Sequence, residues 1–367
     1  MWDTIRDQTQ AVRVIRVHMA RRRIAPAYVF AGPDGVGKRL TALEWAQAIN
    51  CDRGGHPAVG AGSPTGVPSA QREANQGRHR REAVVADGSA EARSAPADLG
   101  EGEACGTCGH CHRIRRHVHP DLHVLEVQGA SQTIQIDDVR RMLGRIALRP
   151  YMGRRSVVIV DGAERLTEEA ANSVLKALEE PPGDTLFLLL TVNPSDCLPT
   201  MVSRCQVIRF RRLSAETIAA LLGQVDEVEP GVAQALSRLA QGSFSRARVL
   251  AHRWEDDQRI RAQIAAAVSG QEPAAVPPHE RQELARWCEQ TIDWLRDMAV
   301  ASVADASLVH HAEVAGTIRE QARRVDPDRC ADAALEAIAW AESLKEQCVS
   351  PRLVATLLRE SWLELAR

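Results

Sequence analysis

The sequence of 367 residues predicts an α/β fold, in which a parallel sheet carrying a phosphate-binding loop is followed by helical domains. Short apolar runs alternate with helical patterns up to residue 211, which is typical of a parallel sheet. The segment Gly32-Pro33-Asp34-Gly35-Val36-Gly37-Lys38-Arg39 has the Gly-x-x-x-x-Gly-Lys spacing of a loop that wraps phosphate. Beyond residue 212 the apolar pattern is wholly helical.

The elements of the sheet region follow from apolar runs and their boundaries. Residues 2–23 have helical periodicity, strand 28–31 leads into the phosphate loop, and a helix follows at 40–49. Further along we predict strands at 123–127, 157–160, 186–191 and 206–210, with helices at 136–148 and 167–178. The last of these helices stops before Pro181-Pro182, because proline cannot continue a helix.

A chain of this length holds two or three domains. Residues 1–211 are the predicted nucleotide-binding-like domain, and 212–268 and 279–367 are two helical domains. Residues 52–104 are rich in Gly, Ala, Pro and Ser without apolar periodicity, so we predict a disordered insertion inside a zinc module at 51–111. Four tryptophans at helical spacing are predicted core residues of the last domain: Trp287, Trp294, Trp340 and Trp362.

The phosphate loop is preceded by a strand and followed by a helix, which is the context this motif requires. Its backbone N–H groups would wrap phosphate oxygens, and Lys38 would reach the terminal phosphates. Position 39 normally carries a Ser or Thr that binds Mg²⁺, but here it is Arg39. We therefore expect weak nucleotide binding without turnover; a Gly-rich turn without a ligand is the alternative. The candidate nucleotide-binding residues are Gly32, Gly35, Val36, Gly37, Lys38 and Arg39.

The second half of a nucleotide site is predicted at Val157–Val160 and Asp161, a buried strand ending in an acid. In phosphate-loop ATPases this acid helps to hold Mg²⁺, and the acid that follows orients the attacking water. Here the following residue is Gly162, which has no side chain. The pattern predicts a nucleotide-binding scaffold that has lost hydrolysis.

Three cysteines with two residues between neighbours, Cys105, Cys108 and Cys111, can aim three thiolates at one point. Zinc requires four tetrahedral ligands, and a structural site has no open position. Three free surface cysteines are the alternative to a structural zinc site. The fourth ligand is predicted to be Cys51, with His110 and His112 as alternatives.

Composition excludes several function classes. With 46 basic and 48 acidic residues, the chain does not coat nucleic acid by bulk electrostatics. No stretch approaches the roughly 18 apolar residues of a membrane span. Nine cysteines without an export signal favour metal ligands or free thiols, so we expect a cytoplasmic protein without a membrane partner.

Four segments together resemble the clamp-loader subunits of bacterial DNA polymerase III, which belong to the AAA+ superfamily. They are Asp161–Thr167, Ala171–Pro182, Leu198-Pro199-Thr200 and Ser203-Arg204-Cys205. The resemblance covers residues 1–250. Because Arg39 and Gly162 break both nucleotide motifs, the chain is more similar to the delta-prime type than to the gamma/tau ATPase.

The resemblance implies a non-catalytic subunit of a DNA-directed DNA polymerase (nucleotidyltransferase) holoenzyme. Such a subunit works in a five-subunit ring with gamma/tau and delta, which places the sliding clamp on primed DNA during replication. It implies that Arg204 acts in trans as an arginine finger on a neighbour's ATP, although an isolated arginine here is usually a surface charge. It also assigns Cys51, Cys105, Cys108 and Cys111 to a zinc module, residues 279–367 to a collar and residues 212–268 to a lid. Asn193 falls near the γ-phosphate sensor, whereas Arg246 is one place late for nucleotide contact.

Two other functions remain open. An active gamma/tau-type clamp-loader ATPase would turn over ATP in isolation. A nucleotide-dependent AAA+ adaptor outside replication would not co-purify with a clamp loader.

Overall fold

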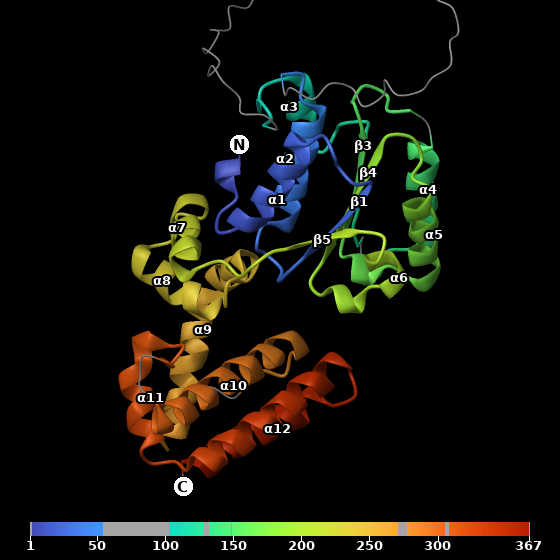
Figure 1. The fold of residues 1–367 in the computed structure, drawn as a ribbon. Helices are drawn as coiled ribbons and strands as arrows, with labels where there is room; N and C mark the ends of the chain where they lie inside the picture. The colour runs from blue at the N-terminus through green and yellow to red at the C-terminus, as the bar shows by residue number, and fades with distance from the viewer. Residues whose placement is uncertain are drawn as a thin grey trace, which may run out of the picture. The chain divides into compact units, whose positions relative to one another are not determined.

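The computed structural model describes residues 2–53, 103–127, 132–147, 149–270, 277–304 and 308–366. Most of the predicted insertion 52–104 lies outside these residues, as does most of the segment 269–278 between the two predicted helical domains. The chain forms two compact units, which are described separately (Figure 1). The first comprises Met1–Gly32 and Gly37–Phe210, and the second comprises Pro33–Val36 and Arg211–Arg367.

A five-stranded parallel sheet forms the centre of the first unit, with strand order β2-β3-β4-β1-β5. The predicted strands are all present, with boundaries shifted by one or two residues. The α/β fold class is therefore confirmed. The strands are β1 (Ala27–Ala31), β2 (Leu122–Leu125), β3 (Ser156–Asp161), β4 (Thr185–Thr191) and β5 (Gln206–Arg209).

Helices cover both faces of the sheet, which is why its inner strands β1 and β4 are buried throughout and mainly apolar (Figure 1). On one face, α4 (Ile136–Ile146) and α5 (Glu168–Glu179) pack on alternate strand residues such as Val29 and Val158. On the other face, Tyr28 and Phe30 lie against Trp45 of α2 (Lys38–Asn50), with ring centroids 4.7 and 6.1 Å apart.

The predicted helix at 2–23 is shorter in the structure. Trp2–Thr4 forms a separate 3-10 turn, η1, and α1 spans Thr9–Ala20. Between them Asp7 has a left-handed backbone, with φ of 58°. A residue in this conformation cannot belong to a right-handed helix. The apolar periodicity of residues 2–23 therefore continues across a break in the helix.

Both ends of α5 have a local cause. Thr167 caps its start by accepting a hydrogen bond from the Ala170 N–H at 3.4 Å, and the helix ends at Glu179, before the two prolines, as predicted.

Four short elements complete the first unit. They are α3 (Gly109–Arg115), η2 (Ala163–Arg165), η3 (Pro194–Asp196) and α6 (Pro199–Val202).

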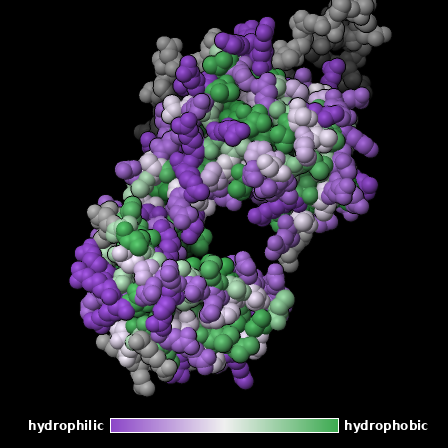
Figure 2. Space-filling model, turned by 60° about the horizontal axis from the view of Figure 1, so that its bottom comes forward, coloured by the Kyte–Doolittle hydropathy of each residue, from purple (hydrophilic) through white to green (hydrophobic). Residues whose placement is uncertain are grey.

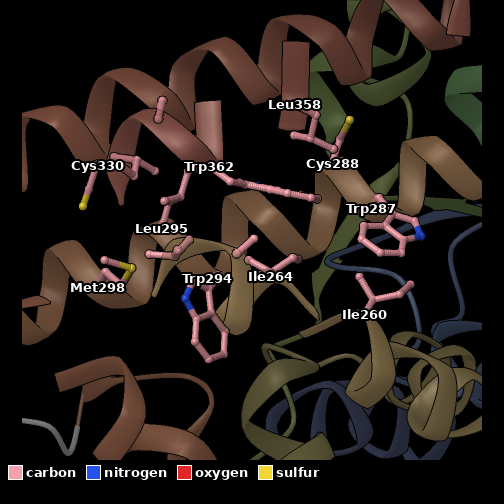
Figure 3. Close-up of a cluster of buried hydrophobic side chains, with 14 of the residues drawn as sticks. Ile260, Ile264, Trp287, Cys288, Trp294, Leu295, Met298, Cys330, Leu358 and Trp362 are labelled. Atoms are coloured by element: carbon pink, nitrogen blue, oxygen red, sulfur yellow. The ribbon is translucent and has the colours of Figure 1, made fainter. Parts of the chain in front are cut away.

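Apart from its four loop residues, the second unit is helical, as predicted. Its elements are α7 (Ala215–Val225), α8 (Pro230–Leu239), α9 (Phe244–Val268), α10 (Arg281–Val303), η5 (Ala312–Val314), α11 (Ala315–Ala322), α12 (Pro327–Lys345) and α13 (Pro351–Leu365). Trp287, Trp294 and Trp362 are buried in its core (Figure 3). Trp340 packs on this core and is half-buried. Ile260 and Ile264 of α9 share this core. The division between a lid and a collar domain stays a prediction.

The surface does not present a continuous apolar belt on the face shown in Figure 2, where hydrophobic and hydrophilic side chains are interspersed. Among the helices built from described residues, none is both long and apolar enough to cross a membrane.

Candidate functional site

The predicted phosphate loop connects β1 to α2, at the carboxyl edge of the parallel sheet. In α/β sheets ligands bind at this edge. Gly37 caps the helix with φ of 98°, a conformation that glycine adopts without strain. Lys38 and Arg39 open α2, so both lie at the positive end of its helix dipole. Gly35 and Val36 belong to the second unit, where the Gly35 carbonyl accepts a hydrogen bond from the Phe244 N–H at 3.1 Å.

Lys38 is held in a defined position beside the loop. Its side chain is buried, and Nζ donates a hydrogen bond to the carbonyl of Gly32 at 2.5 Å. Burial raises the pKa of Asp161, and the ammonium group of Lys38 is one of the charges that counteract this rise. The lysine that the motif assigns to phosphate contact therefore lies close to where β1 and β3 end.

Arg39 makes two contacts that the motif did not predict. One guanidinium nitrogen, Nη1, forms an ion pair with Glu126 and lies 3.1 Å from Oδ2 of Asp161. Glu126 follows β2, and Asp161 ends the neighbouring strand β3. Burial disfavours the charge on Arg39, but the two carboxylates outweigh burial and raise its pKa.

These residues do not fit Mg²⁺. That ion needs an octahedral set of oxygen ligands, and position 39 supplies a cation instead of a hydroxyl. Thr41, the nearest hydroxyl along the helix, donates to the Gly37 carbonyl at 2.8 Å. Gly162 occupies the position where an ATPase has its water-orienting acid. It has no side chain, and its backbone is left-handed, with φ of 85° and ψ of 58°.

Arg204 lies on an exposed turn between α6 and β5. Its Nη1 donates to the carbonyl of Thr200 at 3.0 Å, and its Nη2 lies 2.6 Å from Oε1 of Glu179. Both side chains are partly exposed, at 39% and 45%. The guanidinium is therefore accessible from outside the first unit and held by two oxygens. Glu179 lies at the end of a predicted helix and within the segment Ala171–Pro182, but nothing in the local sequence indicated that it pairs with Arg204.

The predicted sensor residue Asn193 is engaged locally. Its side-chain oxygen accepts a hydrogen bond from the Ser195 N–H at 3.2 Å, and its amide donates to Asp196 at 3.3 Å. Arg246 lies in the first turn of α9, and its backbone N–H donates to the hydroxyl of Ser243 at 3.2 Å. The role predicted for Asn193 therefore stays a prediction.

The four predicted zinc cysteines come together, with their Sγ atoms all within 4.8 Å of one another. A tetrahedral site with Zn–S bonds of about 2.3 Å needs sulfurs roughly 3.8 Å apart, so this donor set fits zinc. Among the described residues, the cluster contains neither His110 nor His112. His110 instead pairs with His119, with ring nitrogens 2.8 Å apart.

Local structure explains how the sulfurs converge. Cys51 follows the last turn of α2 and Cys108 caps α3, so two helix ends aim their cysteines at one point. Backbone N–H groups donate to sulfur: Cys105 to Cys51 and Cys108 to Cys105, both at 3.2 Å. Burial opposes ionisation of Cys105, but hydrogen bonds from Thr107 and from the Cys108 N–H lower its pKa to about 6. By contrast, burial and the hydrogen bond with Cys108 raise the pKa of Cys111, so a metal would have to displace the proton of that thiol.

Comparisons with known proteins show which family the chain resembles. Residues 83–214 match the family described as DNA polymerase III, delta subunit. The chain is 34% identical over 185 residues to "DNA polymerase III subunit delta'" of Pseudomonas aeruginosa, covering 50% of this chain and 43% of that protein. It is 28% identical over 233 residues to the Bacillus subtilis protein of the same name, covering 63% and 56%.

The predicted resemblance to DNA polymerase III clamp-loader subunits is confirmed. A third relative is "DNA polymerase III subunit tau" of Salmonella typhimurium, 30% identical over 227 residues, covering 60% of this chain and 28% of that protein. The chain thus spans about half the length, or less, of these three relatives. The family match includes Asp161, Arg204 and the three clustered cysteines, but it excludes the phosphate loop and Cys51.

Proposed function

We propose that the chain is a delta-prime-type subunit of the bacterial DNA polymerase III clamp loader. It helps to place the sliding clamp on primed DNA but does not hydrolyse ATP itself. The observation that carries this proposal is a contrast inside the first unit. Arg204 is presented on an exposed turn, whereas Arg39 is paired with Asp161, the acid of the chain's own nucleotide motif, and with the neighbouring Glu126. A subunit that contributes an arginine but no hydrolytic site has this combination.

In this role Arg204 acts in trans. It would reach the ATP of a neighbouring subunit, where a planar, permanently charged guanidinium stabilises the charge that develops on the γ-phosphate. The proposed partners are the gamma/tau and delta subunits in a five-subunit ring, the sliding clamp and, through the assembled complex, primed DNA. The compartment is the cytoplasm, and residues 279–367 form the collar by which the ring assembles.

The phosphate loop retains a binding function in this proposal. Its backbone N–H groups and Lys38 would bind ATP or ADP weakly through the phosphates. Hydrolysis is absent because Gly162 cannot orient water and Arg39 replaces the metal-binding hydroxyl.

The four cysteines would hold a structural zinc ion, which supplies a tight cross-link and no open coordination position. It would tie the carboxyl end of α2 to the amino end of α3, two segments separated by the insertion. Since such a site does not exist in an unfolded chain, its binding energy stabilises the fold.

An active gamma/tau-type ATPase is the second candidate, favoured by the similarity to a tau subunit. The two functions differ in one measurement, ATP turnover by the isolated chain. Gly162 argues against turnover, because it has no side chain to orient the attacking water. A nucleotide-dependent adaptor outside replication would fail to assemble with clamp-loader subunits.

Reconstitution tests the proposal. The chain should be mixed with the gamma/tau and delta subunits of its own organism, and clamp loading onto primed DNA should be followed with and without it. We expect loading and DNA-stimulated ATP hydrolysis to require this chain, while the chain alone has background turnover. Full loading activity without the chain, or failure to join the complex, would contradict the assignment.

A further inference from the structure

The guanidinium of Arg39 lies where the two acids at the carboxyl edge of the sheet converge. Asp161 ends β3, and Glu126 follows the adjacent parallel strand β2. Both carboxylates contact the same nitrogen, Nη1. Arg39 itself is the second residue of α2, directly after the lysine of the phosphate loop. The cluster therefore combines residues from three elements at one point.

These acids need a cation. Burial raises the pKa of Asp161 and the neighbouring Glu126 raises it further, while Arg39 and Lys38 counteract this rise. Two carboxylates close together disfavour each other's ionisation unless a positive charge lies between them. In a phosphate-loop ATPase Mg²⁺ supplies charge at the corresponding acid, and the phosphates and a loop hydroxyl complete its coordination.

A guanidinium supplies this charge in a different form. It remains charged at any physiological pH, and its donors are directed toward carboxylate oxygens. Once Asp161 bonds to Arg39, one of its oxygens no longer has a free approach for a metal. A second, divalent cation at the same place would also be repelled by the guanidinium.

We propose that Arg39 permanently takes the place of the divalent cation, so that this loop binds the phosphates of a nucleoside di- or triphosphate without metal. The inference refines the nucleotide binding in the proposed function, and it rests on that function only for the choice of ligand. The guanidinium of Arg39 then neutralises the charge of Asp161 and Glu126 at any Mg²⁺ concentration.

The first arm of the test measures metal binding by the isolated, zinc-loaded chain, with Mn²⁺ as a spectroscopic substitute for Mg²⁺. Electron paramagnetic resonance should detect no Mn²⁺ bound to the wild type. R39S restores the hydroxyl of the motif and leaves both acids without their partner, so it should bind one Mn²⁺. The double variant R39S/D161N should lose it again. R140S, which removes an exposed arginine from α4, is the matched control and should behave as wild type.

The second arm measures binding of a fluorescent ADP analogue to the same proteins, in EDTA and in excess Mg²⁺. The wild-type dissociation constant should agree within about twofold between the two buffers, whereas metal should tighten binding to R39S by about tenfold or more. Thermal unfolding confirms that R39S is folded.

Several results would overturn the inference. One is a Mn²⁺ ion on the wild type that D161N removes. Another is a folded R39S that binds none. The third is wild-type nucleotide binding that requires Mg²⁺, or that is absent in both buffers. Neither arm involves the ring, so a failure of clamp loading in reconstitution leaves these results unaffected.

Discussion

The Nη2 atom of Arg204 lies 2.6 Å from the Oε1 atom of Glu179, which joins the turn after α6 to the last residue of α5. The second guanidinium nitrogen donates to the carbonyl of Thr200. Two oxygens therefore fix a partly exposed side chain that is otherwise long and flexible. The donor that contacts Glu179 must therefore leave this carboxylate before it can bind any other oxygen.

Arg204→Ala should leave the chain folded and able to join the clamp loader, because the side chain lies on the surface. Hydrolysis at the one neighbouring ATP site that it serves should fall by roughly 10³–10⁵, the usual contribution of an arginine finger. Arg204→Lys should be nearly as damaging, since an ammonium group cannot form the planar fork of donors. Single-turnover hydrolysis by the reconstituted complex measures the effect.

The matched control for this experiment is Arg209→Ala, which removes an exposed arginine from β5. It should leave hydrolysis and clamp loading unchanged. Wild-type loading rates in Arg204→Ala complexes would show that Arg204 is only a surface charge.

Glu179→Gln separates the positioning of Arg204 from its chemistry. Because the ion pair is partly exposed, its loss should change the free energy of unfolding by at most about 1 kcal/mol. Arg204 then no longer has to leave a carboxylate before it contacts a phosphate, so hydrolysis in the complex should rise, by at most about fivefold. Urea denaturation and the same single-turnover assay measure both effects. Glu180→Gln, at the next position, is the control, and equal effects of the two variants would contradict a specific role for Glu179.

Zinc content tests the cysteine cluster. Elemental analysis should find one zinc per chain, and Cys51→Ser should reduce both zinc content and thermal stability because the binding energy of the metal is folding energy. Cys348→Ser, at an exposed cysteine outside the cluster, should change neither. Unchanged zinc stoichiometry and sulfur coordination in Cys51→Ser would remove Cys51 from the ligand set.

Features that depend only on residues close together in the sequence could be predicted, such as strands and cysteine spacings. A strand such as Val157–Val160 is a run of β-branched residues, and the spacing of Cys105, Cys108 and Cys111 specifies a knuckle whatever the rest of the chain does. Cys51 was predictable as well, because it ends the helix that the phosphate loop begins. The left-handed break at Asp7 was not predictable, since the apolar period continued across it.

Contacts between side chains from distant segments were the main feature that the sequence did not predict. Glu126 and Glu179 carry no motif of their own, and each acquires its role by reaching an arginine from a distant segment. Asp121 also finds its partners in a distant segment, but these are backbone groups: its carboxylate accepts hydrogen bonds from the N–H groups of Tyr151 and Gly153, both at 2.6 Å. Which acid meets which arginine depends on strand order and helix placement, which local pattern does not encode.

Acid stability of the second unit should depend on Asp297, which is fully buried. Its carboxylate accepts hydrogen bonds from the N–H groups of His310 and His311, at 3.1 and 3.0 Å, and lies 2.7 Å from Nδ1 of His311. Burial alone would raise the pKa of Asp297, but the contacts with His311 and the backbone N–H groups outweigh it and lower the pKa. A carboxylate with a depressed pKa stabilises the fold above its unfolded value and loses this contribution as pH falls through the folded one. The free energy of unfolding should therefore decrease below about pH 4.

Asp297→Asn should lower stability at neutral pH and flatten this acid dependence, as measured by urea denaturation between neutral pH and pH 3. Asp332→Asn, at an exposed position of α12, is the control. An identical pH profile in wild type and Asp297→Asn would exclude this carboxylate as the origin of the acid sensitivity.

The proposed loss of hydrolysis should not be reversible by restoring one side chain. Gly162 has a left-handed backbone, and a Cβ atom there would lie 3.2 Å from Cδ of Arg165. Gly162→Ala should therefore destabilise the chain by about 1–2 kcal/mol, the strain of a non-glycine residue in this conformation. Gly144→Ala is the matched control, because Gly144 lies on the exposed side of α4 with open space around it. It should be stabilising by up to about 1 kcal/mol, the helix propensity of alanine over glycine.

Gly162→Glu should accordingly be destabilised and still hydrolyse ATP at background. A glutamate forced into this backbone projects in a different direction from one in the right-handed conformation, and Arg39 remains on Asp161. Only the combination Arg39→Ser/Gly162→Glu removes the internal cation and adds an acid, and even then the backbone at position 162 must rearrange before water can be oriented. Steady-state turnover of ATP by the isolated chain measures this. Turnover by Gly162→Glu alone at the rate of an ordinary AAA+ enzyme, abolished by adding Lys38→Ala, would mean that the site had lost only one side chain.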